Sequence, residues 1–264
     1  MFKTTLKKMK TEMASPIQYY LETENGFLNI NFCLEKQLTL QHKGSQCLQC
    51  SLERPIFRLG FCQRCFFDSP AAGEWIMRPE LSKAHLGQAD RDLAYEAEVQ
   101  LQPHIVYLAL SSHLKVGVTR KSQLPTRWID QGAHQAMALL EVPNRYLAGV
   151  GEVALKAHFS DKTNWRKMLQ KPTENIDWEE ERNKALDVLP NDLKPYIVHD
   201  STEKITLDFP VHQYPEKVTS LNLEKTPFFE GQLVGIKGQY WIFEDQTVFN
   251  VRGNEGQKIM LTIA

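Results

Sequence analysis

The feature that most constrains the fold of this chain is a set of four cysteines arranged as two C-x2-C pairs. Cys47 and Cys50 form the first pair, Cys62 and Cys65 form the second, and eleven residues separate the pairs. Each short pair can direct two thiolates toward one point, and zinc takes four such ligands in a tetrahedron. The spacing therefore predicts a structural zinc site in a short hairpin, with no ligand position open for chemistry.

Paired cysteines can also form disulfides, a redox-active pair or an iron–sulfur cluster. A reducing cytoplasm disfavours disulfides, and a redox motif needs one pair on a βα turn rather than two pairs around a hairpin. We therefore favour zinc. The fifth cysteine, Cys33, lies in residues 28–34, whose alternation is typical of a strand, and we expect it to be a buried apolar side chain.

Length and composition place the chain among ordinary globular proteins. It has 264 residues, 42% of them apolar and 24% charged, which is enough for one large core or several small ones. No apolar run approaches the roughly 18 residues that span a bilayer. We expect a cytoplasmic protein without membrane contact. Met13 offers a second possible start, so residues 1–12 are expected to be a tail.

The net charge of −1 conceals an uneven distribution along the chain. Residues 1–102 carry 12 basic and 12 acidic side chains, residues 103–172 carry 10 and 4, and residues 173–264 carry 9 and 16. Apart from chance scatter, a basic middle segment suits a phosphate-rich ligand, because Lys and Arg displace the counterions condensed on nucleic acid. The same boundaries divide the chain into three expected modules.

Hydrophobic patterns predict an α+β protein. Residues 17–41 alternate as two or three strands before the zinc knuckles, and residues 82–99 suit a helix or an arm. Residues 104–110, 114–119 and 135–142 predict a three-stranded antiparallel sheet, with helices at 125–131 and 144–159 in the order β-β-α-β-α. An acidic helix at 178–189 precedes glycine-broken strands at 231–263, which indicate a small β-barrel or meander.

Glu152 is the most informative single acid in the basic middle segment. It shares a helical stripe with Ala148, Leu155 and Phe159, which are all apolar. A carboxylate in such a stripe is costly unless it is paired or bound to a metal, and Mg²⁺ accepts one or two carboxylates with water and phosphate completing its shell. The alternative is a surface glutamate at the margin of the stripe.

The same segment carries a series of short motifs in a fixed order. Val-Tyr-Leu at 106–108 is followed by Val-Gly-Val-Thr at 116–119, then by Arg127, Glu152 and, twelve residues later, Asn164. In order and spacing, residues 104–166 resemble the GIY-YIG nuclease domain. The resemblance implies an active site made from Tyr107, Gly117, Arg127, Glu152 and Asn164.

The resemblance also implies a role for each residue. Glu152 would hold one Mg²⁺ or Mn²⁺, Arg127 would clamp the phosphate, and Tyr107 would orient or deprotonate the attacking water. Asn164 would fix local structure or contact a phosphate. Lys115 stands about where the second motif has a tyrosine, and a lysine there could lower the pKa of a neighbouring phenol or water. The expected site is therefore a metal-dependent phosphodiesterase or a degenerate form of one.

Each of these residues also has an ordinary structural interpretation. Arg127 could be an exposed helix arginine, Lys115 a strand-edge lysine and Tyr107 a core aromatic side chain. Four histidines share no metal-ligand spacing and are expected at turns or on the surface: His104, His113, His134 and His158.

A second resemblance covers the whole chain. Asp-Lys-Thr-Asn-Trp at 161–165 and Gly-Ile-Lys-Gly-Gln-Tyr at 235–240 are similar to an uncharacterised bacterial family of unknown function. The combined expectation is a protein that binds DNA or RNA through its central module. The alternative is a zinc-containing scaffold that binds a protein partner and has no catalytic activity.

Overall fold

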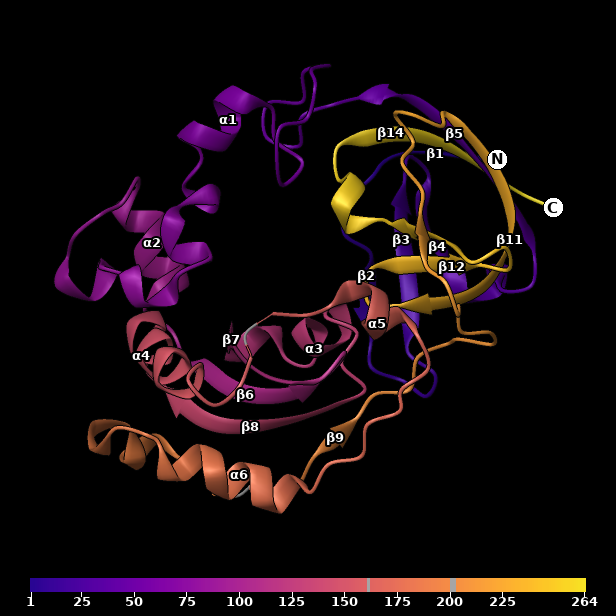
Figure 1. Ribbon diagram of the computed structural model, residues 1–264. Coiled ribbons are helices and arrows are strands. Elements are labelled where there is room, and N and C mark those ends of the chain that lie inside the picture. Colours follow the sequence, from indigo (N-terminus) through magenta and orange to yellow (C-terminus); the bar gives the residue numbers. More distant parts are fainter. Residues whose placement is uncertain (161, 200–202) are drawn as a thin grey trace.

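The computed structural model describes residues 1–160, 162–199 and 203–264, which form a mixed α+β structure with three β-sheets (Figure 1). The strands in chain order are β1 (Phe2–Thr5), β2 (Lys10–Glu12), β3 (Gln18–Thr23), β4 (Gly26–Asn29), β5 (Gln37–Ser45), β6 (His104–Leu110), β7 (Leu114–Arg120), β8 (Gln135–Val142), β9 (Ile205–Thr206), β10 (Thr219–Ser220), β11 (Phe228–Lys237), β12 (Tyr240–Phe243), β13 (Thr247–Asn250) and β14 (Gln257–Ile263). The α-helices are α1 (Gln63–Asp68), α2 (Leu93–Gln100), α3 (Thr126–Asp130), α4 (Arg145–Leu155), α5 (Trp165–Leu169) and α6 (Trp178–Asp187).

The largest sheet combines strands from both ends of the chain. Its seven strands run in the order β1-β14-β5-β11-β12-β13-β10. β5 pairs antiparallel with β14 on one side and with β11 on the other, so its backbone groups are satisfied by the last forty residues of the chain. The expected first and third modules thus share one sheet. Because β1 and β10 remain as its two edges, the described strands form no closed barrel.

The first twelve residues are part of this architecture. β1 pairs with β14, β2 pairs with β3, and the side chains of Leu6 and Met9 between them have no exposed surface. The expectation of a tail was therefore wrong. Burial of these two large apolar side chains stabilises the segment by about 1.5–3 kcal/mol per side chain. The lysine-rich composition of residues 1–12 gave no sign of this burial.

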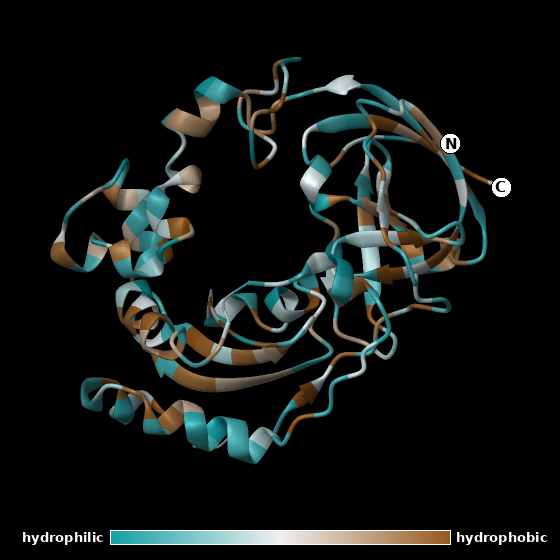
Figure 2. Ribbon diagram, viewed as in Figure 1, coloured by the Kyte–Doolittle hydropathy of each residue, from teal (hydrophilic) through white to brown (hydrophobic). Residues whose placement is uncertain are grey.

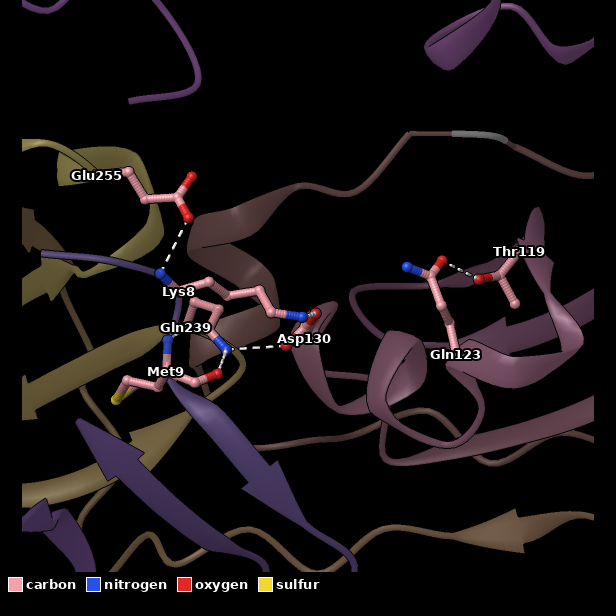
Figure 3. A network of polar contacts seen from close by, with 7 residues as sticks. All are labelled: Lys8, Met9, Thr119, Gln123, Asp130, Gln239 and Glu255. Carbon is pink, nitrogen blue, oxygen red and sulfur yellow. Dashed lines mark hydrogen bonds and ion pairs between the residues drawn. The ribbon is translucent and has the colours of Figure 1, made fainter. Parts of the chain in front are cut away.

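A polar network joins this N-terminal segment to the middle and the end of the chain (Figure 3). The Lys8 ammonium lies 2.7 Å from Asp130 at the end of α3, and the Gln239 amide donates to the same carboxylate at 2.8 Å. Gln239 also accepts from the backbone N–H of Met9 at 2.8 Å, and Glu255 accepts from that of Lys8 at 2.9 Å. Three distant parts of the sequence therefore meet at α3.

The middle segment folds in the expected order of strand, strand, helix, strand and helix, here β6, β7, α3, β8 and α4. Its sheet has the order β7-β6-β8-β9, so β6 lies between two partners. The fourth strand is a difference from the expectation: β9, from beyond residue 172, pairs with the start of β8. All seven residues of β6 are buried because both faces of the sheet are covered, and β6 and β8 are mainly hydrophobic in Figure 2.

The two faces of β6 belong to different cores. Tyr107 packs in a cluster with side chains of the N-terminal and C-terminal strands, including Tyr19 and Trp241. Val106 packs on the opposite face with α4 and with Trp178 of the acidic helix α6. The predicted module boundaries at 102 and 172 are therefore crossed by shared apolar cores.

An arm made by residues 46–100 leaves the end of β5, carries α1 and α2, and returns to α4 (Figure 1). The arm ends against α4 at Gly149, where an added Cβ would lie 2.2 Å from the backbone N of Glu80. Arg145 fixes the same contact, since its guanidinium donates to the carbonyls of Trp75 at 3.0 Å and Ile76 at 2.8 Å. The position of the arm thus depends on the first turns of α4.

One of the four histidines expected at turns or on the surface, His104, is internal, and a second, His134, is half-buried. His104 has no exposed surface, and its Nδ1 lies 2.7 Å from the Gln102 carbonyl. Burial lowers the pKa of His104 to about 4, and burial with the nearby charge of Lys237 lowers the pKa of His134 to about 4. The expectation was wrong for His104, because a neutral imidazole can be buried in a way that a charged one cannot. His134 is half-buried in the bend before β8, in agreement with the expected turn.

Acid is therefore expected to destabilise the fold before the carboxylates titrate. The unfolded chain binds protons at these histidines near pH 6.5, whereas the folded chain does not until about pH 4. Stability is thus complete above pH 6.5 and falls as the pH drops toward 4, by up to about 3 kcal/mol for the buried His104 and by less for the half-buried His134. Urea unfolding of wild type, His104→Gln and the exposed-site control His158→Gln along this range measures the slope. Equal slopes for wild type and His104→Gln would contradict the assignment.

Candidate functional site

The four paired cysteines converge at the start of the arm. The Sγ atoms of Cys47, Cys50, Cys62 and Cys65 all lie within 4.8 Å of one another, and Cys47 and Cys62 are buried. Four thiolates around one zinc ion lie about 3.8 Å apart, since each Zn–S bond is about 2.3 Å. The four cysteines therefore fit a metal such as zinc, with a modest shortening of the distances between their Sγ atoms.

Backbone conformation explains why these short turns gather the thiolates. Ser51 and Gly60 adopt positive φ angles of 59° and 74°, which reverse the chain after the first pair and before the second. The backbone N–H of Leu48 donates to the Gly60 carbonyl at 2.9 Å, and that of Cys62 donates to Cys47 Sγ at 3.2 Å. Burial raises the pKa of Cys47, but hydrogen bonds from backbone N–H groups outweigh it and lower this pKa below its ordinary value. These contacts favour the thiolate form.

Tyr107 occupies the centre of the middle sheet. Its ring lies over Gly117 on β7, where an added Cβ would be 2.7 Å from the Tyr107 hydroxyl. The hydroxyl donates to the side-chain carbonyl of Gln131 at 3.0 Å, one helical turn after Arg127. Burial raises the pKa of Tyr107, the charge and hydrogen bonding of Arg127 oppose this, and the charge of Glu152 raises it further.

Glu152 is a buried residue of α4. Its carboxylate lies 3.5 Å from the ammonium of Lys156. Arg145 lies two turns earlier on the same side, where burial lowers the pKa of its guanidinium to about 10 while the charge of Glu152 opposes that shift. Tyr107, Arg127 and Glu152 thus come from three elements. Arg127 and Glu152 both affect the pKa of Tyr107, and both also affect that of Arg145.

Lys115 and Asn164 lie at one end of the same sheet and have structural contacts. The Lys115 ammonium is buried and donates to Thr163 Oγ1 at 2.7 Å. Asn164 caps α5, since its side chain accepts from the Lys167 N–H at 3.1 Å, and its own N–H donates to Ser112 at 3.0 Å. These contacts join the β6–β7 hairpin to the segment that leads into α5.

The surroundings of Glu152 fit a divalent cation poorly. Lys156 already lies beside the carboxylate, and the positive charge of Arg145 is close enough to interact with it. A magnesium ion at the Glu152 carboxylate would compete with both cations. Binding of Mg²⁺ or Mn²⁺ at Glu152 therefore stays an untested prediction of the GIY-YIG resemblance.

Arg145 was missed in the sequence although a signal was present. It stands seven residues before Glu152, so both lie on one face of the helix that the sequence predicted. Its partners are carbonyls of the arm, seventy residues away in sequence, which no local pattern indicates.

Comparison with known proteins extends the second sequence resemblance. Residues 35–259 match the family described as "Protein of unknown function (DUF2797)". The chain belongs to this family. The DUF2797 match includes the four cysteines, the middle sheet and most of the largest sheet, and it brings no activity. No curated protein and no solved structure matches the chain. The GIY-YIG resemblance gains no support from these comparisons.

No helix among the described residues has the length and apolar character needed to cross a membrane.

Proposed function

We propose that this DUF2797 protein binds DNA or RNA through a degenerate GIY-YIG-like site on its middle sheet. The observation that carries the proposal is the electrostatic group of Tyr107, Arg127 and Glu152, supplied by β6, α3 and α4. An arginine fork beside a phenol suits a phosphodiester, because the guanidinium can hold two phosphate oxygens at once.

The positive charge of the middle segment, residues 103–172, also supports binding of DNA or RNA. Residues 103–172 carry ten basic and four acidic side chains, and Arg120 and Arg127 both lie close enough to Arg145 to lower its pKa. Arg145 is committed to carbonyls of the arm, whereas Arg127 is half-buried on a short helix. We assign phosphate contact to Arg127 and a positioning role to Arg145.

The contacts of Lys115 and Glu152 favour binding of nucleic acid without efficient cleavage. Lys115 replaces the second-motif tyrosine and donates to Thr163, and Glu152 is paired with Lys156. Neither arrangement supplies a base or a free metal ligand for hydrolysis.

The test combines binding and cleavage in one reaction. Labelled branched, single-stranded and duplex DNA and RNA are incubated at low salt with Mg²⁺ or Mn²⁺, using wild type and Glu152→Gln. We expect bound but uncut nucleic acid with both proteins. If wild type cleaves the nucleic acid and Glu152→Gln does not, the site is an active nuclease rather than a degenerate one. Absence of binding to every substrate would contradict the proposal.

A second candidate function, a protein-interaction scaffold, is favoured by one observation on the zinc hairpin. The rings of Phe57, Phe66 and Phe67 form a cluster with centroids 5.2–5.8 Å apart, and Phe57 and Phe67 are 44% and 57% exposed. Exposed aromatic clusters of this kind occur at protein interfaces. Failure to bind nucleic acid would favour this function.

We further propose that zinc is the metal of the four cysteines and that the protein works in a reducing compartment such as the cytoplasm. Support comes from the all-thiolate donor set, which zinc prefers, and from the need to keep the thiols reduced.

A further inference from the structure

The segments 161–165 and 235–240 meet in space, although 69 residues separate them in the sequence. The ring of Trp165 stacks on that of Tyr240 with centroids 5.8 Å apart and planes 5° from parallel. α5 is pressed against the end of α3, since a Cβ on Gly132 would lie 2.3 Å from the sulfur of Met168. Asp161, the first residue of the earlier segment, lies outside the described residues. These contacts lie at the boundary between the middle sheet and the largest sheet, which we call the seam.

Lys237 is buried beside this seam. It is the last residue of β11, its side chain has no exposed surface, and its ammonium lies 5.6 Å from the ring centroid of Phe209 and 5.5 Å from that of Tyr214. Among the described residues, its Nζ has no hydrogen-bond acceptor. A buried ammonium without an acceptor is costly, and burial lowers the pKa of Lys237 to about 8.

His134 places a second unsatisfied group beside the first. Neither ring nitrogen of His134 has a hydrogen-bond partner in the described part of the chain, and both are buried. Burial lowers the pKa of His134, the charge of Lys237 lowers it further and the charge of Glu174 opposes the shift, so His134 lies within electrostatic range of both charges. The Lys237 ammonium and the His134 imidazole are thus two buried groups that can donate a hydrogen bond and have no acceptor among the described residues.

A cavity of about 790 Å³ lies beside these groups. His134 and Tyr214 both line it, and the Lys237 ammonium, which does not line it, lies 5.5 Å from the centroid of the Tyr214 ring. Lys171 and Glu216 add one charge of each sign to the lining, and Lys167 and Glu174 form an ion pair there. The volume lies in the range of small-molecule sites.

We propose that this cavity binds a small oxyanion, a phosphate or carboxylate group, held by His134 and Lys237. An anionic oxygen supplies both the acceptor and the countercharge that the two side chains lack. Tyr214, which contacts the ammonium and lines the cavity, turns aside to admit the ligand to Lys237. The site is distinct from the group around Arg127 and does not depend on nucleic-acid binding.

Calorimetric titration of the full chain tests the site with inorganic phosphate and with succinate as separate probes, at constant ionic strength set by chloride. We expect saturable binding of at least one probe at millimolar or lower concentration. Lys237→Met and His134→Gln should each weaken binding by about tenfold or more, since each removes a charged or strong hydrogen bond. Lys194→Met, an exposed lysine outside the cavity lining, should leave the affinity unchanged.

A measurement on unsubstituted protein covers the case in which a variant does not fold. The His134 ring signals in an NMR titration with the bound probe should shift saturably, and the pKa of His134 should rise when the anion is present. Absence of heat and of any His134 shift with both probes would overturn the proposal. So would equal affinity in wild type and in a folded Lys237→Met variant.

Discussion

Removal of zinc is expected to unfold the hairpin of residues 46–68 while the middle sheet stays folded. In this hairpin Phe57 and Phe67 are exposed, so few apolar contacts replace the metal. Structural zinc contributes about 10–16 kcal/mol of apparent binding free energy in small zinc modules, which is more than such a hairpin can supply from packing. Metal analysis should find one zinc per chain, and hydrogen exchange after chelation should accelerate in the hairpin first.

The chain contains its own control for this prediction. Cys65→Ser removes one ligand and should lower both the zinc content and the protection of the hairpin amides. Cys33→Ala changes a buried cysteine outside the cluster and should leave the zinc content at one per chain. A metal-free protein with a fully protected hairpin would show that the four thiols are held together by packing alone.

Gly149→Ala is expected to separate the arm from α4 and to cost about 3 kcal/mol or more of stability. The new Cβ would lie 2.2 Å from the Glu80 backbone N and 2.5 Å from the Pro79 carbonyl carbon, and backbone atoms cannot move aside as a side chain can. The helix itself would gain up to about 1 kcal/mol from the substitution, so any net loss comes from the clash. Chemical unfolding measures it.

Gly151→Ala is the matched control, two residues further along the same helix. Its Cβ would meet only side-chain atoms, with Leu140 Cδ1 at 3.2 Å and Val106 Cγ2 at 3.3 Å. We expect a change within about 1 kcal/mol, because the helix gain offsets a small adjustment of the two side chains. Equal stability of the two variants would mean that the arm does not rest on α4 as described.

The middle segment could be predicted from sequence because its signals are local. The apolar run at 104–110 is typical of a strand buried on both faces, and the amphipathic pattern of the helix that carries Glu152 is equally local. The cysteine cluster followed from ligand spacing alone. Each of these features is decided by neighbours in the chain.

The largest sheet could not be predicted for the opposite reason. Alternation shows that Leu38 and Leu40 face a core, but it does not say that their strand pairs with Gln257–Ile263. The glycines at 235 and 238 did indicate close backbone packing, and Val211 lies against the first of them. The burial of the Lys237 amine between these glycines could not be predicted, because a lysine at the end of a strand is normally exposed to solvent.

The measurement that tests the central claim most directly is the salt dependence of nucleic-acid affinity for wild type and Arg127→Gln. Fluorescence anisotropy gives Kd across a salt series, with Lys225→Gln, an exposed lysine of the acidic C-terminal third, as the charge-matched control. The proposal predicts weaker binding by Arg127→Gln and a logarithmic salt slope reduced by about 1, with the control unchanged. The same affinity and slope for wild type and Arg127→Gln would contradict the assignment of phosphate binding to this site.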